Sequence, residues 1–190
     1  HVLSRRQRQM CIRDRVLSAA SVEKANSGHP GMPMGMAEVG TVLFGNILNI
    51  SNKNPDWINR DRFVLSAGHG SMLLYSLLHF NGYDISMDDI KAFRQLDSNT
   101  AGHPEVDTAL GIDITTGPLG QGFSTGVGLA LAETYLAEIF GKDVIDHYVY
   151  GIVSDGDLME GVSFEAAELA GVWKLGCLLY TSDAADDLGR

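Results

Sequence analysis

The sequence has very few cysteines: among its 190 residues, only Cys11 and Cys177 carry a thiol. Both lie near the ends of the chain, so the long stretch between them contains none. Small secreted proteins with little hydrophobic core rely on several disulfides, and two distant cysteines cannot build such a framework. The cysteine content therefore excludes a disulfide-stapled fold and is typical of a reducing cytoplasm.

The sequence also lacks a long hydrophobic run and has little positive charge. No window approaches the ~18 uninterrupted apolar residues of a membrane-spanning helix. The chain has 14 lysines and arginines against 24 acidic residues, a net charge of −10. Because phosphate contacts need clustered basic side chains, this charge argues against nucleic acid as a partner. An anion bound here must be held by backbone amides, histidines or a metal ion.

The two ends differ from the middle in composition. Residues 1–15 contain five arginines and one acidic residue. Such a leader is typical of an organelle transit peptide, but the strings RRQRQMCIRDR and CLLYTSDAADD resemble translated sequencing-adapter reads. We therefore predict a non-native leader at 1–15, one domain at 16–176 and a non-native tail at 177–190. That length is sufficient for a single α/β domain with a real core.

The clearest pattern in the chain is a strand that ends on acidic residues. Residues 148–153 are β-branched and aromatic apart from Gly151, which predicts a strand buried on both faces of a parallel sheet. Asp155-Gly156-Asp157 follows, and helical spacing resumes at 165–169. Ligands bind at the carboxyl ends of such strands, where a carboxylate suits Mg²⁺. The alternative is a turn with solvated acids, because Asp-Gly is a common turn pair.

The other periodic segments support an α/β fold. We expect helices at 16–26, 35–48 and 71–80, a short helix that starts near Ser86, a strand at 62–66, and a long helix from about 122 to 140. The polar connection at 49–61 is expected to be anchored by Trp57 and Ile58. Strands that alternate with helices are typical of a parallel sheet flanked by helices.

Three of the six histidines lie in glycine-flanked loops, each just after a regular element: His29, His69 and His103. A histidine without bulky neighbours can turn its ring into a cavity and transfer protons near neutral pH; the structural alternative is a loop histidine that bonds its own backbone. A zinc site is a further alternative, but HxH or HExxH spacing is absent. His79 and His147 lie within helix and strand patterns and are interpreted as structural.

The stretch ITTGPLGQGF at 114–123 is the strongest anion-binding pattern. Glycines precede the long helix, so free backbone amides at its start can bind a phosphate. The GxxxxG spacing resembles a P-loop, but Phe123 stands where that motif requires lysine, which argues against a nucleoside triphosphate. The helix has small residues at every fourth position, which are expected to let another helix approach closely: Gly122, Gly126 and Ala130.

Together, in this order, the motifs resemble one family. The chain carries SGHPG at 27–31, SAGHGS at 66–71, GHPE at 102–105, TGPLGQG at 116–122 and SDGDLMEG at 154–161. This series resembles the amino-terminal, diphosphate-binding domain of the transketolase family of thiamine diphosphate enzymes, and the resemblance covers residues 16–176. It implies the fold of that domain, a parallel sheet flanked by helices, truncated at its C-terminal side. Dihydroxyacetone synthase is a close alternative within the same resemblance.

The resemblance also implies a role for individual residues. It predicts as catalytic residues His29, His103 and Glu160, as cofactor-binding residues His69, Gly117, Pro118, Leu119 and Gly156, and as metal ligand Asp155. The cofactors implied are thiamine diphosphate and Mg²⁺, and the substrates are sugar phosphates. The two histidines are expected to face the sugar channel, and the glutamate to join a proton-sharing network across a homodimer. The implied reaction is transfer of a two-carbon ketol unit in a cytoplasmic enzyme of the pentose phosphate route.

The sequence departs from the family after Lys174-Leu175-Gly176. The family continues with a strand and an asparagine-bearing turn that completes the metal site, whereas CLLYTSDAADDLGR follows here. We therefore expect those ligands to be missing and the chain to be an inactive fragment on its own. Two alternatives from other classes remain open: a binding module or split subunit that holds a diphosphate and metal for a partner, and a metal-dependent hydrolase that uses the three histidines with Asp155.

Overall fold

The structure is a computed structural model that describes residues 4–183. Three parallel strands form one sheet in the order β1-β2-β3: β1 (Arg62–Leu65), β2 (Val149–Val153) and β3 (Leu178–Ser182). The helices are α1 (Arg5–Ala25), α2 (Gly31–Val42), α3 (Ser71–Phe80), α4 (Met87–Lys91), α5 (Gln121–Phe140), α6 (Asp155–Met159) and α7 (Gly161–Trp173), with shorter turns at η1 (Leu43–Ile47), η2 (Gly68–Gly70) and η3 (Thr108–Leu110). None of the described helices has the length and apolar character needed to cross a bilayer.

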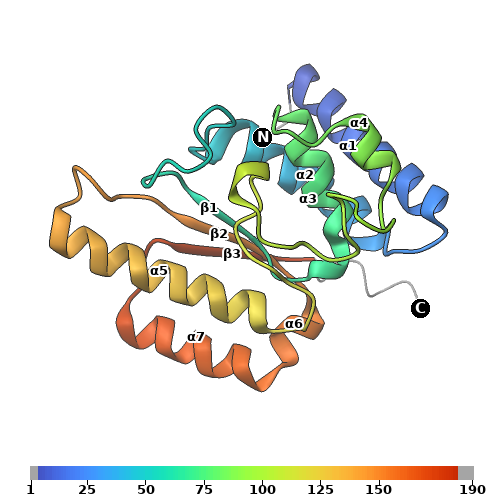
Figure 1. Ribbon diagram of the computed structural model, residues 1–190. Helices are drawn as coiled ribbons and strands as arrows, with labels where there is room; N and C mark the ends of the chain where they lie inside the picture. The colour runs from blue at the N-terminus through green and yellow to red at the C-terminus, as the bar shows by residue number, and fades with distance from the viewer. Residues whose placement is uncertain (1–3, 184–190) are drawn as a thin grey trace.

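The sheet lies between two groups of helices, with α1–α4 on one side and α5 and α7 on the other (Figure 1). Alternate side chains of a strand point to opposite faces. Phe63 and Leu65 therefore join the core under α2 and α3, while Val64, Val149 and Val153 join the core under α5. Both faces are covered, as in parallel sheets generally. The expected α/β fold with a parallel sheet flanked by helices is confirmed.

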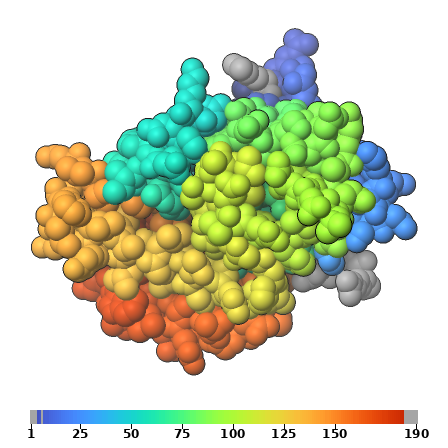
Figure 2. Space-filling view, viewed as in Figure 1, coloured from blue at the N-terminus to red at the C-terminus, as the bar shows by residue number. Residues whose placement is uncertain are grey.

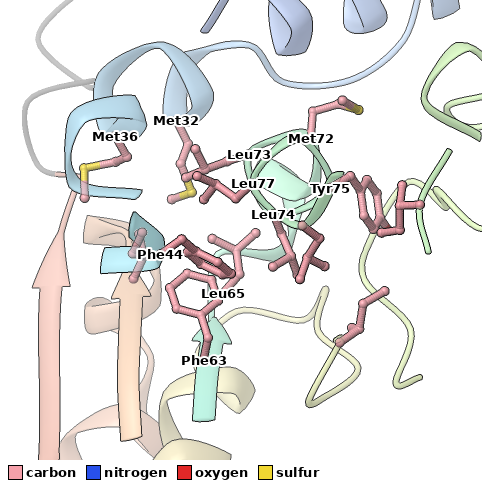
Figure 3. Close-up of a cluster of buried hydrophobic side chains, with 14 of the residues drawn as sticks. Met32, Met36, Phe44, Phe63, Leu65, Met72, Leu73, Leu74, Tyr75 and Leu77 are labelled. Atoms are coloured by element: carbon pink, nitrogen blue, oxygen red, sulfur yellow. The ribbon is translucent and has the colours of Figure 1, made fainter. Parts of the chain in front are cut away.

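The larger core lies between α2, α3 and the sheet. In the close-up, Met32 of α2 and Leu73 and Leu77 of α3 point toward one another above the side chains of β1 (Figure 3). A Cβ atom at Gly40 would lie 2.7 Å from Leu77 Cδ1, so the absence of a side chain there lets α2 and α3 pack closely. This core holds β1 and the segment after it in place.

The small residues of α5 face the sheet. A Cβ at Gly122 would lie 2.5 Å from Ser66 Cα, and one at Gly126 would lie 1.8 Å from the Tyr180 hydroxyl. Ala130 is fully buried in the core beneath the same helix. The prediction that these residues let another helix approach is therefore wrong: they let α5 approach the strands.

Most helices and strands lie where the sequence predicts them, with different boundaries. The helix expected at 16–26 is the last part of α1, which ends where Asn26 adopts a left-handed conformation (φ 49°). The helix expected at 35–48 begins at Gly31 and continues into η1. Residues 49–61 are only partly anchored: Trp57 is partly buried, whereas Ile58 is 57% exposed, so the prediction for Ile58 is wrong.

Both predicted non-native ends contribute to regular structure. Helix α1 includes residues from the predicted leader, and β3, in the predicted tail, pairs with β2. A strand therefore follows Gly176 although the sequence there departs from that of the family. The physical reason is the β-forming sequence of β3 and the ring of Tyr180, which stacks on Phe123 with centroids 4.5 Å apart. The foreign origin of the two ends stays a prediction.

Candidate functional site at the carboxyl ends of β1 and β2

Strands β1 and β2 are each followed directly by a serine that fixes the segment after it. Ser66 follows β1 and accepts a hydrogen bond from the Phe123 amide at 2.8 Å, which ties the start of α5 to the strand end. Ser154 follows β2 and caps α6 by accepting from the Asp157 amide at 3.3 Å. The chain therefore turns sharply after each strand, and the residues next to these turns meet at one edge of the sheet.

The glycine-rich loop at 116–120 crosses both strand ends. At β1, a Cβ at Gly68 would lie 2.6 Å from Thr116 Oγ1 and 2.9 Å from the Gly117 amide nitrogen, so the loop backbone lies directly on the turn that carries His69. At β2, the Gly120 amide donates to Asp157 Oδ1 at 2.9 Å. In the space-filling view, the yellow-green segment leading into α5 covers the middle of this face (Figure 2).

The two carboxylates after β2 have different roles, which the sequence did not separate. Asp157 is fully buried and accepts from the backbone amides of Gly120 and Ser154. Asp155, at the first position of α6, is partly exposed, and no hydrogen bond within residues 4–183 engages its carboxylate. The predicted acidic turn is in fact the short helix α6. The Ser-x-x-Asp spacing of a capping box was the signal that could have revealed this.

The structure brings the three glycine-flanked histidines together. The rings of His29 and His69 meet edge-on with centroids 5.1 Å apart. His103 lies over the glycine loop, because a Cβ at Gly117 would be 3.4 Å from His103 Cγ. Burial lowers the pKa of His29, helped by the nearby His69 and Arg94. Burial also lowers the pKa of His103, helped by Arg94 and His29. Neutral rings that can accept a proton are therefore favoured at neutral pH.

The remaining predicted residues continue from the histidines toward α6. Leu119 lies against α6, since a Cβ at Gly156 would be 3.2 Å from Leu119 Cδ1. Glu160, just after α6, is exposed and lies beside Gly120. A Cβ at Gly120 would be only 2.8 Å from Glu160 Cβ, and Gly120 has a left-handed conformation (φ 80°), so glycine is needed there. Pro118, next to Leu119 in the loop, is exposed. The glycine loop thus connects the imidazoles at β1 with the carboxylates at β2.

Two polar residues that the sequence did not single out lie in the same place. Thr116 is buried, and its hydroxyl has no hydrogen-bond partner among the described residues. Arg94, three residues after the end of α4, reaches toward the loops that carry His29 and His103. Nothing in the local spacing of the sequence around Arg94 indicates where its side chain points.

The zinc alternative finds no support in the geometry. Within residues 4–183, no group of three or more His, Cys, Asp or Glu side chains has an arrangement that could hold a metal ion. His79 has a structural contact, because its Nδ1 lies 2.7 Å from the Ile85 carbonyl oxygen. His147 is buried two residues before β2, away from the carboxyl ends of the strands.

Comparison with known proteins gives a consistent picture. The profile of the family described as "Transketolase, thiamine diphosphate binding domain" matches residues 6–186. The transketolase of Bacillus subtilis is 57% identical over 175 residues, which cover 90% of this chain and 26% of the relative. The transketolase of Geobacillus stearothermophilus is 58% identical over the same length and shares.

Solved structures agree with the sequence relatives. The transketolase of Campylobacter jejuni superposes with a TM-score of 0.90 at 50% identity and covers 95% of this chain. That of Leishmania mexicana has a TM-score of 0.90 at 48% identity and covers 96%. The matched region is 29% and 28% of those chains, so this chain spans little more than a quarter of the length of the proteins it resembles.

Proposed function

The chain belongs to the transketolase family, and we propose that it supplies the diphosphate-binding part of an enzyme that transfers a two-carbon ketol unit from a ketose phosphate to an aldose phosphate. The observation that carries this proposal is the glycine loop at 116–120, which joins three clustered histidines to the acidic turn after β2. Ligands bind at this edge of open α/β sheets. Thiamine diphosphate and Mg²⁺ are the proposed cofactors.

The residues at the strand ends fit a diphosphate and its metal. Gly156 lies in the first turn of α6, where backbone amides have no partner within the helix and suit an anion. Asp155 offers an uncommitted carboxylate, and Mg²⁺ commonly takes one or two protein carboxylates together with phosphate oxygens. The unpartnered hydroxyl of buried Thr116 adds a polar group that a ligand would satisfy. An acidic chain can thus bind a polyanion without a basic patch.

Each predicted site residue then has a specific role. When bound, thiamine diphosphate would supply the carbanion chemistry of the reaction, so the residues of this chain would bind and orient the reactants and move protons. Gly117, Pro118 and Leu119 would hold the cofactor from the side of the loop. His29 and His103 would bond substrate hydroxyls and accept or return a proton, since rings with lowered pKa values are neutral at the working pH. His69, edge-on to His29, would contact the cofactor.

A homodimer is part of the same proposal. Large apolar side chains are exposed on the outer helices, among them Tyr135 and Ile139 of α5 and Phe164 and Val172 of α7. Exposed apolar surface of this extent is typical of an interface. Glu160 precedes α7 and is itself exposed, which suits a carboxylate that shares a proton with the partner subunit. We further propose a cytoplasmic location and a place in pentose phosphate metabolism.

The proposal is tested in a chimera. Residues 16–176 replace the matching region of the Bacillus subtilis transketolase, and ketol transfer between a ketose phosphate and an aldose phosphate is assayed with thiamine diphosphate and Mg²⁺. We expect activity. Asp155→Ala should reduce the activity at limiting Mg²⁺ by about 100-fold, because a metal ligand is lost. His103→Ala should reduce kcat by about 100-fold or more through lost proton transfer.

Asp143→Ala is the matched control for Asp155→Ala, because Asp143 is an exposed acid in the loop between α5 and β2. It should leave the activity of the chimera unchanged. A folded chimera without ketol transfer, or an Asp155→Ala variant with the Mg²⁺ requirement of the parent, would refute the proposal. The unmodified chain should be inactive alone, and ketol transfer by it would contradict that expectation.

A further inference from the structure

Arg94 joins two loops that are far apart in the sequence. Its Nη1 donates to the Ser27 hydroxyl at 3.0 Å, and its Nη2 lies 3.4 Å from the Gly102 carbonyl oxygen. Ser27 is two residues before His29, and Gly102 is one residue before His103. A single guanidinium therefore contacts a side chain in the loop of His29 and a backbone carbonyl in the loop of His103, the two histidines proposed as catalytic.

The surroundings of Arg94 are built around its side chain. Its backbone is held by a hydrogen bond from its own amide to the Thr100 carbonyl at 3.0 Å, and its guanidinium carbon lies 5.6 Å from the centroid of the Phe93 ring. A Cβ at Gly102 would lie 3.3 Å from Arg94 Nε, so glycine leaves room for the guanidinium. The Nε atom is buried and has no hydrogen-bond partner among residues 4–183. A buried N–H without a partner is costly and commonly marks a place where a ligand or water bonds.

The charges that face the two rings are few. His29 is faced by His69 and Arg94, and His103 by Arg94 and His29. Glu105, the nearest acid in sequence to His103, is exposed. Arginine stays protonated at every working pH, so its charge opposes a second positive charge on either ring.

We propose that Arg94 is a positioning residue, which ties the loop of His29 to the loop of His103 and places a fixed positive charge beside both rings. This deepens the proposed function, on which the catalytic role of the two histidines rests. The physical contacts themselves do not depend on that role. Arg94 touches neither ring by a hydrogen bond that the structure records, so its effect on the reaction would act through the histidines.

The test uses the chain as it is. The side-chain nitrogens of histidine are followed by ¹⁵N NMR between pH 5 and 8 in the parent chain and in Arg94→Gln, Arg94→Lys and Lys91→Gln. Removing the charge in Arg94→Gln should raise the pKa of both His29 and His103 by about half a pH unit, the size expected for a neighbouring charge in a partly solvated site. Arg94→Lys keeps the charge and should keep both pKa values close to those of the parent. Lys91→Gln, an exposed lysine on α4, should change neither.

Unchanged pKa values in Arg94→Gln, or a rise in Arg94→Lys as large as in Arg94→Gln, would overturn the proposal. Salt gives a test without substitution should Arg94→Gln fail to fold. In an acidic chain, screening generally lowers histidine pKa values, whereas screening of Arg94 should raise those of His29 and His103. A fall of both values on going from low to high salt would contradict the proposal.

These titrations separate this proposal from the proposed function, because they need neither cofactor nor turnover. An inactive chimera with the expected pKa changes would refute ketol transfer and leave the role of Arg94 in place. An active chimera in which Arg94→Gln changes neither the histidine pKa values nor the pH profile of kcat would support ketol transfer and refute the role of Arg94. A purely structural arginine would lower stability without moving that pH profile.

Discussion

The two faces of the sheet are covered to very different degrees. On one face, α3 is buried from Ser71 through Leu78 and lies under α1 and α2. On the other face, α7 buries only Ser163 and Ala166 and leaves Phe164 and Val172 63% and 73% exposed. The core on the α1–α4 side is thus covered by two layers of helices, and we call it the covered core, whereas α7 leaves large apolar side chains exposed.

This difference divides the candidate site as well. The histidines lie on loops of the α1–α4 side, where the packed core fixes them: His29 before α2, His69 before α3 and His103 after α4. The glycine loop and the acidic turn belong to the α5–α7 side. We infer that the histidines proposed for proton transfer are held by the chain's own core, while the groups proposed for the diphosphate and metal depend more on what covers the other face.

The largest effect on stability is expected in the covered core. Leu77→Ala should lower the free energy of unfolding by about 4 kcal/mol, because Leu77 is fully buried between α2 and α3 and its removal leaves a cavity. Leu129→Ala is the matched change on the other side, where the side chain is only partly buried, and should cost less than half as much. Urea unfolding measures both. Equal losses would contradict the difference between the two faces.

The covered core also contains a buried acid, which should make the stability of the fold depend on pH. Asp14 is fully buried: one carboxylate oxygen accepts from the Thr41 hydroxyl at 3.0 Å, and the other has no partner among the described residues. Burial raises the pKa of Asp14 from 3.8 to about 6. The folded state therefore binds this proton more tightly than the unfolded state does.

The stabilisation of the folded state by this proton is fully present below about pH 4 and is lost as the pH rises through about 6. The loss in the free energy of unfolding from this group is about 3 kcal/mol. Asp14→Asn should remove that loss and be the more stable protein at pH 7. Urea unfolding between pH 4 and 8 in both proteins isolates the difference. A parallel pH dependence in the two would show that Asp14 is not its source.

On the other face, close packing of α5 against β3 is tested at Gly126. Gly126→Ala should cost about 2 kcal/mol, because the new Cβ would lie 1.8 Å from the Tyr180 hydroxyl and the ring would have to move. Gly128→Ala is the control two residues along the same helix: no atom lies within 4 Å of its Cβ position, so alanine should stabilise by about 0.5–1 kcal/mol. Thermal unfolding distinguishes the two, and a tolerated Gly126→Ala would mean that β3 does not lie against α5.

The smallest effect on stability is expected on the exposed face. Phe164→Ser should change the free energy of unfolding by less than about 0.5 kcal/mol, because the side chain is mostly exposed. It should nevertheless reduce self-association, which sedimentation velocity measures. Loss of several kcal/mol instead would show that α7 is packed more tightly than the structure describes.

Much of the architecture was predictable because it depends on local patterns. The uncharged run before Ser154 marks a buried strand, and the Ser86–Asp89 capping box marks the start of α4. Local spacing also places Gly120 just before a helix. The prediction for Ile58 was wrong because an apolar residue in a loop carries no signal of the direction in which it points. The close approach of Gly126 to Tyr180 joins residues 54 positions apart, which no short-range pattern reports.

The sequence by itself determined which chemical groups are present: three glycine-flanked imidazoles, a lysine-free glycine loop and two carboxylates after a strand. Only the tertiary structure decided how they are used. It turned Asp157 inward onto backbone amides and left Asp155 available, and it placed Arg94 between the loops of His29 and His103. The physical reason is that residue type sets what a side chain can bind, whereas burial and distance between remote segments set what it does bind.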